Sequence, residues 1–199
     1  MRSWLRRPIA WWALLALGCA PLLWLVWRTL TDQLGANPAE TLIRATGDWA
    51  IRALCITLAV TPLRTVLGWP EPARFRRLLG LLTFGYAALH LLCYAWFDMG
   101  LDVSDIARDL VKRPFILLGF SAFALLLALA VTSFNRAIRW LGGQRWKALH
   151  RSVYAVAVLA VLHFGWMRSG KQNFDEVWVY AALLAILLGW RLSRHRSAL

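Results

Sequence analysis

The chain alternates between long apolar segments and short segments rich in charged residues. Each apolar segment has roughly 20 residues, the length that a helix needs to cross the hydrocarbon core of a bilayer. A soluble domain of this length would instead show shorter amphipathic segments, with charges along one face of each helix. The pattern therefore predicts an all-α integral membrane protein whose six transmembrane helices span about residues 8–27, 48–67, 77–97, 114–134, 148–167 and 177–192.

The composition supports a membrane protein built as one domain. Of the 199 residues, 60% are hydrophobic, and the mean hydropathy is +0.54, well above that of an ordinary soluble domain. We expect a single transmembrane domain over residues 1–199. No loop is long enough for a soluble nucleotide-binding domain, and neither a GxGxxG motif nor a P-loop is present. The segment 98–113 could form a short surface helix.

The distribution of charge predicts the orientation of the helices. A net charge of +13 would suit a nucleic-acid-binding protein, but the basic residues stand at the ends of apolar segments. We therefore expect membrane lipid and no nucleic acid as a partner. With six spans, most of the 23 Lys and Arg residues fall on the side that holds both termini, and all ten acidic residues except Glu71 fall on the other. The positive-inside rule then predicts that both termini are cytoplasmic.

Histidines are the main ionisable residues of the predicted spans. His90, His150 and His163 lie inside or at the edge of a span, whereas His195 lies in the basic tail and is expected to be solvated. An ionisable residue within a span is costly and therefore indicates a functional site. No Asp or Glu lies deep in a span, which disfavours a proton pump or ion transporter. Neutral imidazole is a good ligand for heme iron.

The depth of the histidines favours heme stacked across the membrane. The predicted helices 77–97 and 148–167 both run outward, so His90 and His163 have similar depth in the outer half and could hold one heme between them. His150 precedes His163 by 13 residues, or roughly 20 Å, which places it near the inner surface as a ligand of a second heme. Along a continuous helix, however, the two would point about 140° apart. The alternative for each histidine is a hydrogen bond between helices.

Four arginines lie near the inner ends of the predicted helices that carry the histidines. They could pair with heme propionates or with the phosphate of a flavin. Their position is equally well explained by the positive-inside rule alone. These residues are Arg76, Arg77, Arg145 and Arg151.

The arrangement of these histidines resembles the ferric-reductase-like transmembrane domain shared with NADPH oxidases and, more narrowly, the MsrQ (YedZ) family. The resemblance covers nearly the whole chain. It rests on the segments Thr61–Arg64, Arg76–Gly80, His90–Tyr94, Lys112–Ile116, Leu129–Ser133, Trp146–Tyr154 and His163–Phe164. The chain departs from the oxidases in one respect: they have a second histidine about 14 residues before the one that corresponds to His90, and Arg76 stands there in this chain. The second axial ligand of an inner heme is therefore not evident.

The resemblance implies a role in electron transfer. It implies one or two b-type hemes, FMN near the inner face, and location in the bacterial inner membrane. The electron donor would be the quinone pool or a cytosolic flavin reductase, since the flavin and nicotinamide domain of the oxidases is missing here. The acceptor would be a periplasmic, molybdenum-containing MsrP-like reductase that repairs oxidised methionines, so the terminal reductase chemistry would lie on a partner.

Two other functions are consistent with the sequence. A stand-alone ferric reductase would reduce external ferric chelates without a protein partner. A small transporter or assembly factor would bind no cofactor, and the purified protein would be colourless.

Overall fold

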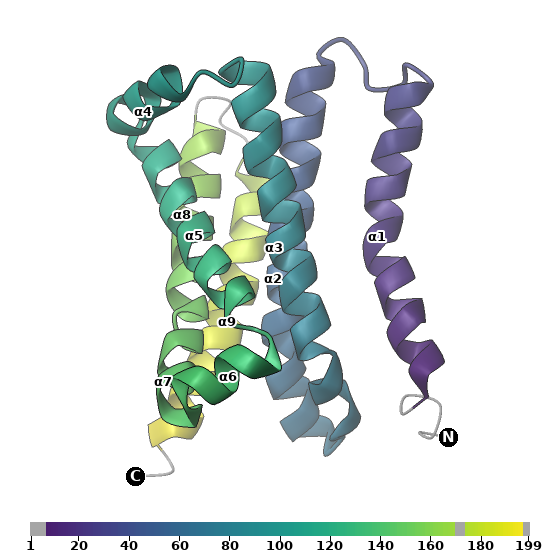
Figure 1. Cartoon of the computed structure of the whole chain (residues 1–199), viewed down its shortest axis with the longest axis vertical. Helices are drawn as coiled ribbons and strands as arrows, with labels where there is room; N and C mark the ends of the chain where they lie inside the picture. The colour runs from purple at the N-terminus through teal and green to yellow at the C-terminus, as the bar shows by residue number, and fades with distance from the viewer. Residues whose placement is uncertain (1–6, 170–173, 197–199) are drawn as a thin grey trace. The chain divides into compact units, whose positions relative to one another are not determined.

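The computed structural model describes residues 7–169 and 174–196, without the side chains of Leu192 and of residues 194–196, so His195 lies outside the described side chains. Every regular element in this part of the chain is helical (Figure 1). The chain divides into two compact units, Met1–Gly100 and Leu101–Leu199. The elements are α1 (Pro8–Leu30), α2 (Pro38–Leu67), η2 (Glu71–Phe75), α3 (Arg76–Cys93), η3 (Tyr94–Asp98), α4 (Val103–Lys112), α5 (Pro114–Val131), α6 (Asn135–Leu141), α7 (Gly143–His150), α8 (Val153–Ser169) and α9 (Asp175–Arg196). The prediction of one heme-binding domain over residues 1–199 stays a prediction.

Within the described residues, five helices are long and apolar enough to cross a membrane. They are Pro8–Leu30, Pro38–Leu67, Glu71–Asp98, Pro114–Val131 and Gly143–Ser169. The third joins η2, α3 and the π-helical turn η3, and the fifth joins α7 and α8. α9 lies at the position of the sixth predicted span but is not one of these five. The count of six spans and the cytoplasmic location of both termini therefore stay predictions.

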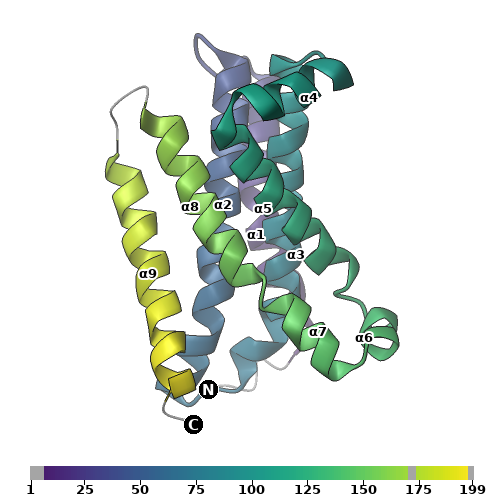
Figure 2. The ribbon, with the colours of Figure 1, turned by 90° about the vertical axis from the view of Figure 1, so that its left-hand side faces the viewer.

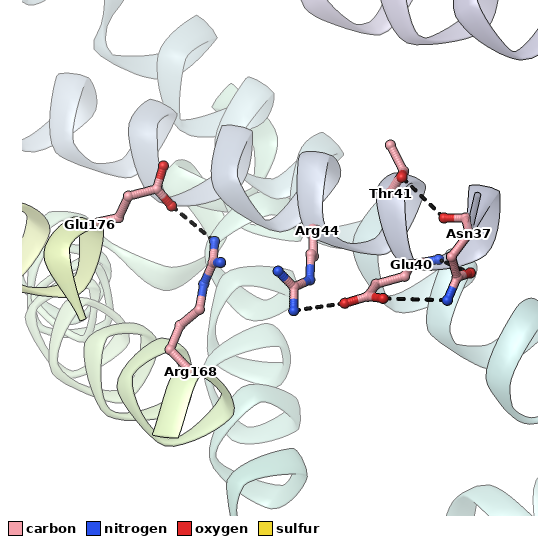
Figure 3. Close-up of polar contacts among 6 residues, drawn as sticks. All are labelled: Asn37, Glu40, Thr41, Arg44, Arg168 and Glu176. Atoms are coloured by element: carbon pink, nitrogen blue, oxygen red, sulfur yellow. Dashed lines mark hydrogen bonds and ion pairs between the residues drawn. The ribbon is translucent and has the colours of Figure 1, made fainter. Parts of the chain in front are cut away.

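α2 begins at Pro38, ten residues before the predicted start of this helix at residue 48, so that boundary was wrong. Its polar first turns lower the hydropathy, but they are stabilised locally. The Asn37 side chain accepts a hydrogen bond from the Glu40 N–H at 3.1 Å, and proline suits the first helical position. Glu40 also pairs with Arg44 at 2.7 Å one turn later (Figure 3). Capping therefore extends the helix beyond its apolar segment.

Replacing the cap tests this account. We expect Asn37→Ala to destabilise the protein by about 1 kcal/mol, because the Glu40 N–H loses its acceptor at the helix terminus. Thermal unfolding of the purified protein in detergent, followed by circular dichroism, measures the change. Asn37→Asp keeps the acceptor and should remain close to wild type. Equal melting temperatures for the two variants would contradict the capping role.

The first unit is organised around α2 and α3, which lie side by side (Figure 1). Leu58 of α2 is 2% exposed and Thr83 of α3 is 1% exposed. The hydroxyl oxygens of Thr57 and Thr83 lie 3.2 Å apart, which links the two helices through a polar contact. α1 joins this pair through a close approach at Gly18, whose carbonyl accepts a hydrogen bond from the Tyr86 hydroxyl at 2.7 Å. Small and hydrogen-bonding residues thus bring the helices together, as expected for helix packing in lipid.

The second unit is organised around α5 and α8, and α9 runs beside α8 (Figure 2). Ala157 of α8 is completely buried, which allows close packing. Ionic and polar contacts join α8 and α9 near both ends. Arg168 donates a hydrogen bond to Glu176 at 2.9 Å (Figure 3), and Arg191 donates one to the Tyr154 hydroxyl at 2.8 Å.

α4 is the short surface helix expected within residues 98–113. Asp102 caps it by accepting a hydrogen bond from the Ser104 N–H at 2.7 Å. Hydrogen bonds from the Ser104 side chain and from the N–H groups of Asp105 and Ser104 hold the pKa of the Asp102 carboxyl below its usual range. The helix ends one residue before Pro114, which occupies the first position of α5.

Candidate functional site

His90 lies near the C-terminal end of α3 and is held by the neighbouring helix α2. Its Nδ1 atom is 2.8 Å from the backbone carbonyl oxygen of Ile43. A carbonyl oxygen only accepts hydrogen bonds, so Nδ1 carries the proton and donates it. In the neutral ring, Nε2 then keeps its lone pair and is the nitrogen that can bind a metal.

His163 of α8 is held in the same way within the second unit. Its Nδ1 atom is 2.6 Å from the carbonyl oxygen of Phe115, near the start of α5. The Phe115 ring also stacks against the imidazole, with the ring centroids 6.3 Å apart and an interplanar angle of 29°. The Nε2 lone pair of His163 is therefore the one left for a ligand, as in His90.

A glycine lies beneath each imidazole, four residues after the carbonyl that holds it. Gly47 follows Ile43 and Gly119 follows Phe115 at this spacing. A Cβ atom on Gly47 would lie 3.1 Å from the His90 ring, and one on Gly119 would lie 2.8 Å from the His163 ring. The two units thus share one local design, although the sequence shows no internal repeat. Sequence analysis missed both glycines; their helix-disfavouring presence inside apolar segments was the only available signal.

His150 has a different environment. It is the last residue of α7, and its Nε2 atom is 3.2 Å from the Thr132 hydroxyl. That hydroxyl donates its single proton to the Ala128 carbonyl at 2.7 Å, so it accepts from Nε2–H, and the lone pair of His150 is on Nδ1. The Trp146 ring stacks on the imidazole with centroids 4.0 Å apart, and its N–H donates to the Thr132 carbonyl at 2.9 Å.

The helix that carries His150 and His163 is interrupted between them. α7 ends at His150, Arg151 and Ser152 form a turn, and α8 begins at Val153. The prediction of one continuous helix over residues 148–167 is therefore wrong at this point. The 140° separation of the two histidines was calculated for a continuous helix, so it does not apply to this chain.

Arg76 occupies in the first unit the place that His150 occupies in the second. Arg76 precedes His90 by 14 residues and donates a hydrogen bond to the Thr61 hydroxyl at 3.0 Å. His150 precedes His163 by 13 residues and contacts the hydroxyl of Thr132. The departure from the oxidases noted in the sequence thus corresponds to an equivalent structural position.

The other three predicted arginines, Arg77, Arg145 and Arg151, are exposed, as is Arg76. Arg77 lies in the first turn of α3, Arg145 in α7, and Arg151 in the turn after it. Exposure leaves these side chains able to meet an anionic group, and their proposed contacts with heme propionates or a flavin phosphate stay predictions.

Comparisons with known proteins agree with this arrangement. Residues 46–161 match the family model described as ferric reductase like transmembrane component. This segment includes both His90 and His150 and ends two residues before His163. With its five apolar helices, the chain is a multi-pass membrane protein. No solved structure matches it.

Several relatives carry the name protein-methionine-sulfoxide reductase heme-binding subunit MsrQ. The protein from Polaromonas naphthalenivorans is 58% identical over 98% of this chain and 89% of its own length. The one from Herminiimonas arsenicoxydans is 52% identical over 80% of this chain and 73% of its own length. The one from Bordetella pertussis is 46% identical over 91% of this chain and 89% of its own length. The chain therefore belongs to the MsrQ family, within the wider family of ferric-reductase-like transmembrane components.

Proposed function

We propose that this chain is a b-type heme subunit that transfers electrons across the bacterial inner membrane to a periplasmic protein-methionine-sulfoxide reductase. The names of its relatives support both the heme and the reductase system. The single observation that carries the proposal is the pair of imidazoles, His90 and His163, each held through Nδ1 by a backbone carbonyl. A histidine that ligates heme iron is commonly oriented by such a hydrogen bond on its other nitrogen.

The residues fit an outer heme well. His90 and His163 are its proposed axial ligands, because each keeps the Nε2 lone pair and has a fixed ring orientation. Heme supplies a one-electron couple, and the protein sets its potential through the ligands, their hydrogen bonds and burial. The terminal reductase chemistry belongs to the partner.

His150 is the proposed ligand of an inner heme, and it fits less directly. Its Nε2 atom is engaged with Thr132, so ligation through this nitrogen requires that the hydrogen bond be released. In the first unit the equivalent position belongs to Arg76, which supplies no imidazole. Binding of an anionic propionate or of the FMN phosphate is the proposed role of Arg76, together with Arg77, Arg145 and Arg151.

The proposed electron donor is the quinone pool or a cytosolic flavin reductase, and the proposed acceptor is a molybdopterin-containing MsrP-like reductase. The family match also favours a second candidate function, a stand-alone ferric reductase. The two differ in their acceptor, because a ferric reductase needs no protein partner.

The optical spectrum of the purified full-length protein tests the proposal. We expect reduced-minus-oxidised bands of b-type heme and one or two hemes per chain. The reduced protein should be re-oxidised by the periplasmic reductase faster than by ferric chelates. A folded preparation without porphyrin would refute the heme assignment, and rapid re-oxidation by chelates alone would favour the ferric reductase.

A further inference from the structure

The geometry points to Gly47 and Gly119 as positioning residues for the heme ligands His90 and His163. We propose that each glycine leaves open the helix surface on which an imidazole lies, so that the carbonyl four residues earlier can hold the Nδ1–H group. This inference rests on the proposed function, and it extends that function to residues outside the ligand set.

The spacing of four residues has a physical reason. In an α-helix, the carbonyl of one residue accepts the N–H of the residue four positions later, which uses one of the two lone pairs of the oxygen. The side chain at that later position stands beside the remaining lone pair, as shown by Ser and Thr side chains that bond back to this carbonyl. With glycine at the later position, a donor from another helix can reach the oxygen. Ile43 with Gly47 and Phe115 with Gly119 have this relation.

The fit is tightest at Gly119. A Cβ atom added there would lie 2.8 Å from Cε1, 2.9 Å from Nδ1 and 3.1 Å from Nε2 of His163. The ring has little freedom to yield, because its Nδ1 atom is bound to the Phe115 carbonyl at 2.6 Å. Alanine would therefore displace the ring, weaken this hydrogen bond and move Nε2.

The fit at Gly47 is looser. An added Cβ atom would lie 3.1 Å from both Cε1 and Nδ1 of His90, so a displacement of a few tenths of an ångström relieves the overlap. The structure therefore predicts an order of effects, with Gly119→Ala more severe than Gly47→Ala.

The same helices contain control glycines. A Cβ atom on Gly85 of α3 meets nothing within 4 Å, and one on Gly165 of α8 makes only an ordinary contact with Val177 at 3.4 Å. Alanine favours the helix over glycine by about 1 kcal/mol at each of the four positions. A loss seen only at residues 47 and 119 therefore cannot result from a weaker helix.

The test compares the four glycine-to-alanine variants of the full-length protein. We expect Gly119→Ala to bind heme about 10-fold more weakly, a typical effect of losing the hydrogen bond that orients a metal-binding histidine. Gly47→Ala should show a smaller change in the same direction. In heme retained by either variant, the low-spin electron paramagnetic resonance signal of the oxidised protein should shift, because it depends on the orientation of the imidazole rings. Gly85→Ala and Gly165→Ala should match wild type in both measurements.

The outcomes separate this inference from the proposed function. If wild type binds heme and both Gly119→Ala and Gly47→Ala match the controls, the inference is wrong and the heme assignment stands. If wild type itself binds no heme, the proposed function fails. If Gly119→Ala does not fold, as shown by circular dichroism, the milder Gly47→Ala decides by the same spectroscopic shift.

Discussion

His163→Ala is expected to remove the outer heme, and His90→Ala is expected to do the same. Each imidazole is proposed to supply one of two axial ligands, and each is already oriented by a carbonyl hydrogen bond. Changes beyond the ligands themselves commonly reduce metal affinity 10–100-fold, so loss of a ligand should leave less than about a tenth of the outer heme bound. Heme quantified per chain and the reduced-minus-oxidised spectrum of the purified variants measure the loss.

Two controls separate ligation from a structural role. His195→Ala changes a histidine that the sequence places in the basic tail, and it should leave the heme content unchanged. Imidazole added to His163→Ala should restore part of the spectrum, because a free ring can enter the space left by the side chain. An unaltered spectrum in His163→Ala would exclude this residue as a ligand.

Leu58→Ala is expected to cause a large loss of stability without removing any proposed ligand. Leu58 is 2% exposed on α2, so truncation leaves a cavity within the first unit. Buried leucine-to-alanine substitutions cost about 2–5 kcal/mol. We expect a value near the lower limit, about 2 kcal/mol, because lipid is as apolar as leucine and only the packing contribution is lost.

Ile56→Ala is the matched control for this effect. Ile56 lies on the same helix and is 52% exposed, so its side chain makes few contacts within the protein. Its truncation should change stability by less than about 0.5 kcal/mol. Unfolding by a graded addition of a denaturing detergent measures both variants against wild type. Equal losses for Leu58→Ala and Ile56→Ala would contradict the packing of α2 described here.

The hydropathy of the sequence was sufficient to predict an all-helical membrane protein and to place the histidines on their helices. A transmembrane segment is recognised from its own apolar residues, averaged over roughly 20 positions, so distant contacts are not needed. The same averaging explains the error at α2. The capped turn from Asn37 to Arg44 is polar, and hydropathy does not register a helix stabilised by a side-chain cap and an ion pair.

The residue types of the site were also evident from the sequence, because an imidazole inside a membrane span requires a reason. The sequence could not predict the partners of these imidazoles. The turn at Arg151 and Ser152, which separates α7 from α8, was also not foreseen.

The sequence by itself determined the fold class, the approximate spans and the candidate ligands His90, His150 and His163. Only the tertiary structure decided which nitrogen of each ring carries the proton and which backbone group fixes it. The contacts of His90 with Ile43 and of His163 with Phe115 join residues 47 and 48 positions apart. Such contacts depend on the rotation and relative height of paired helices, which arise from the packing of many side chains. A property summed along one chain segment contains no information about that rotation.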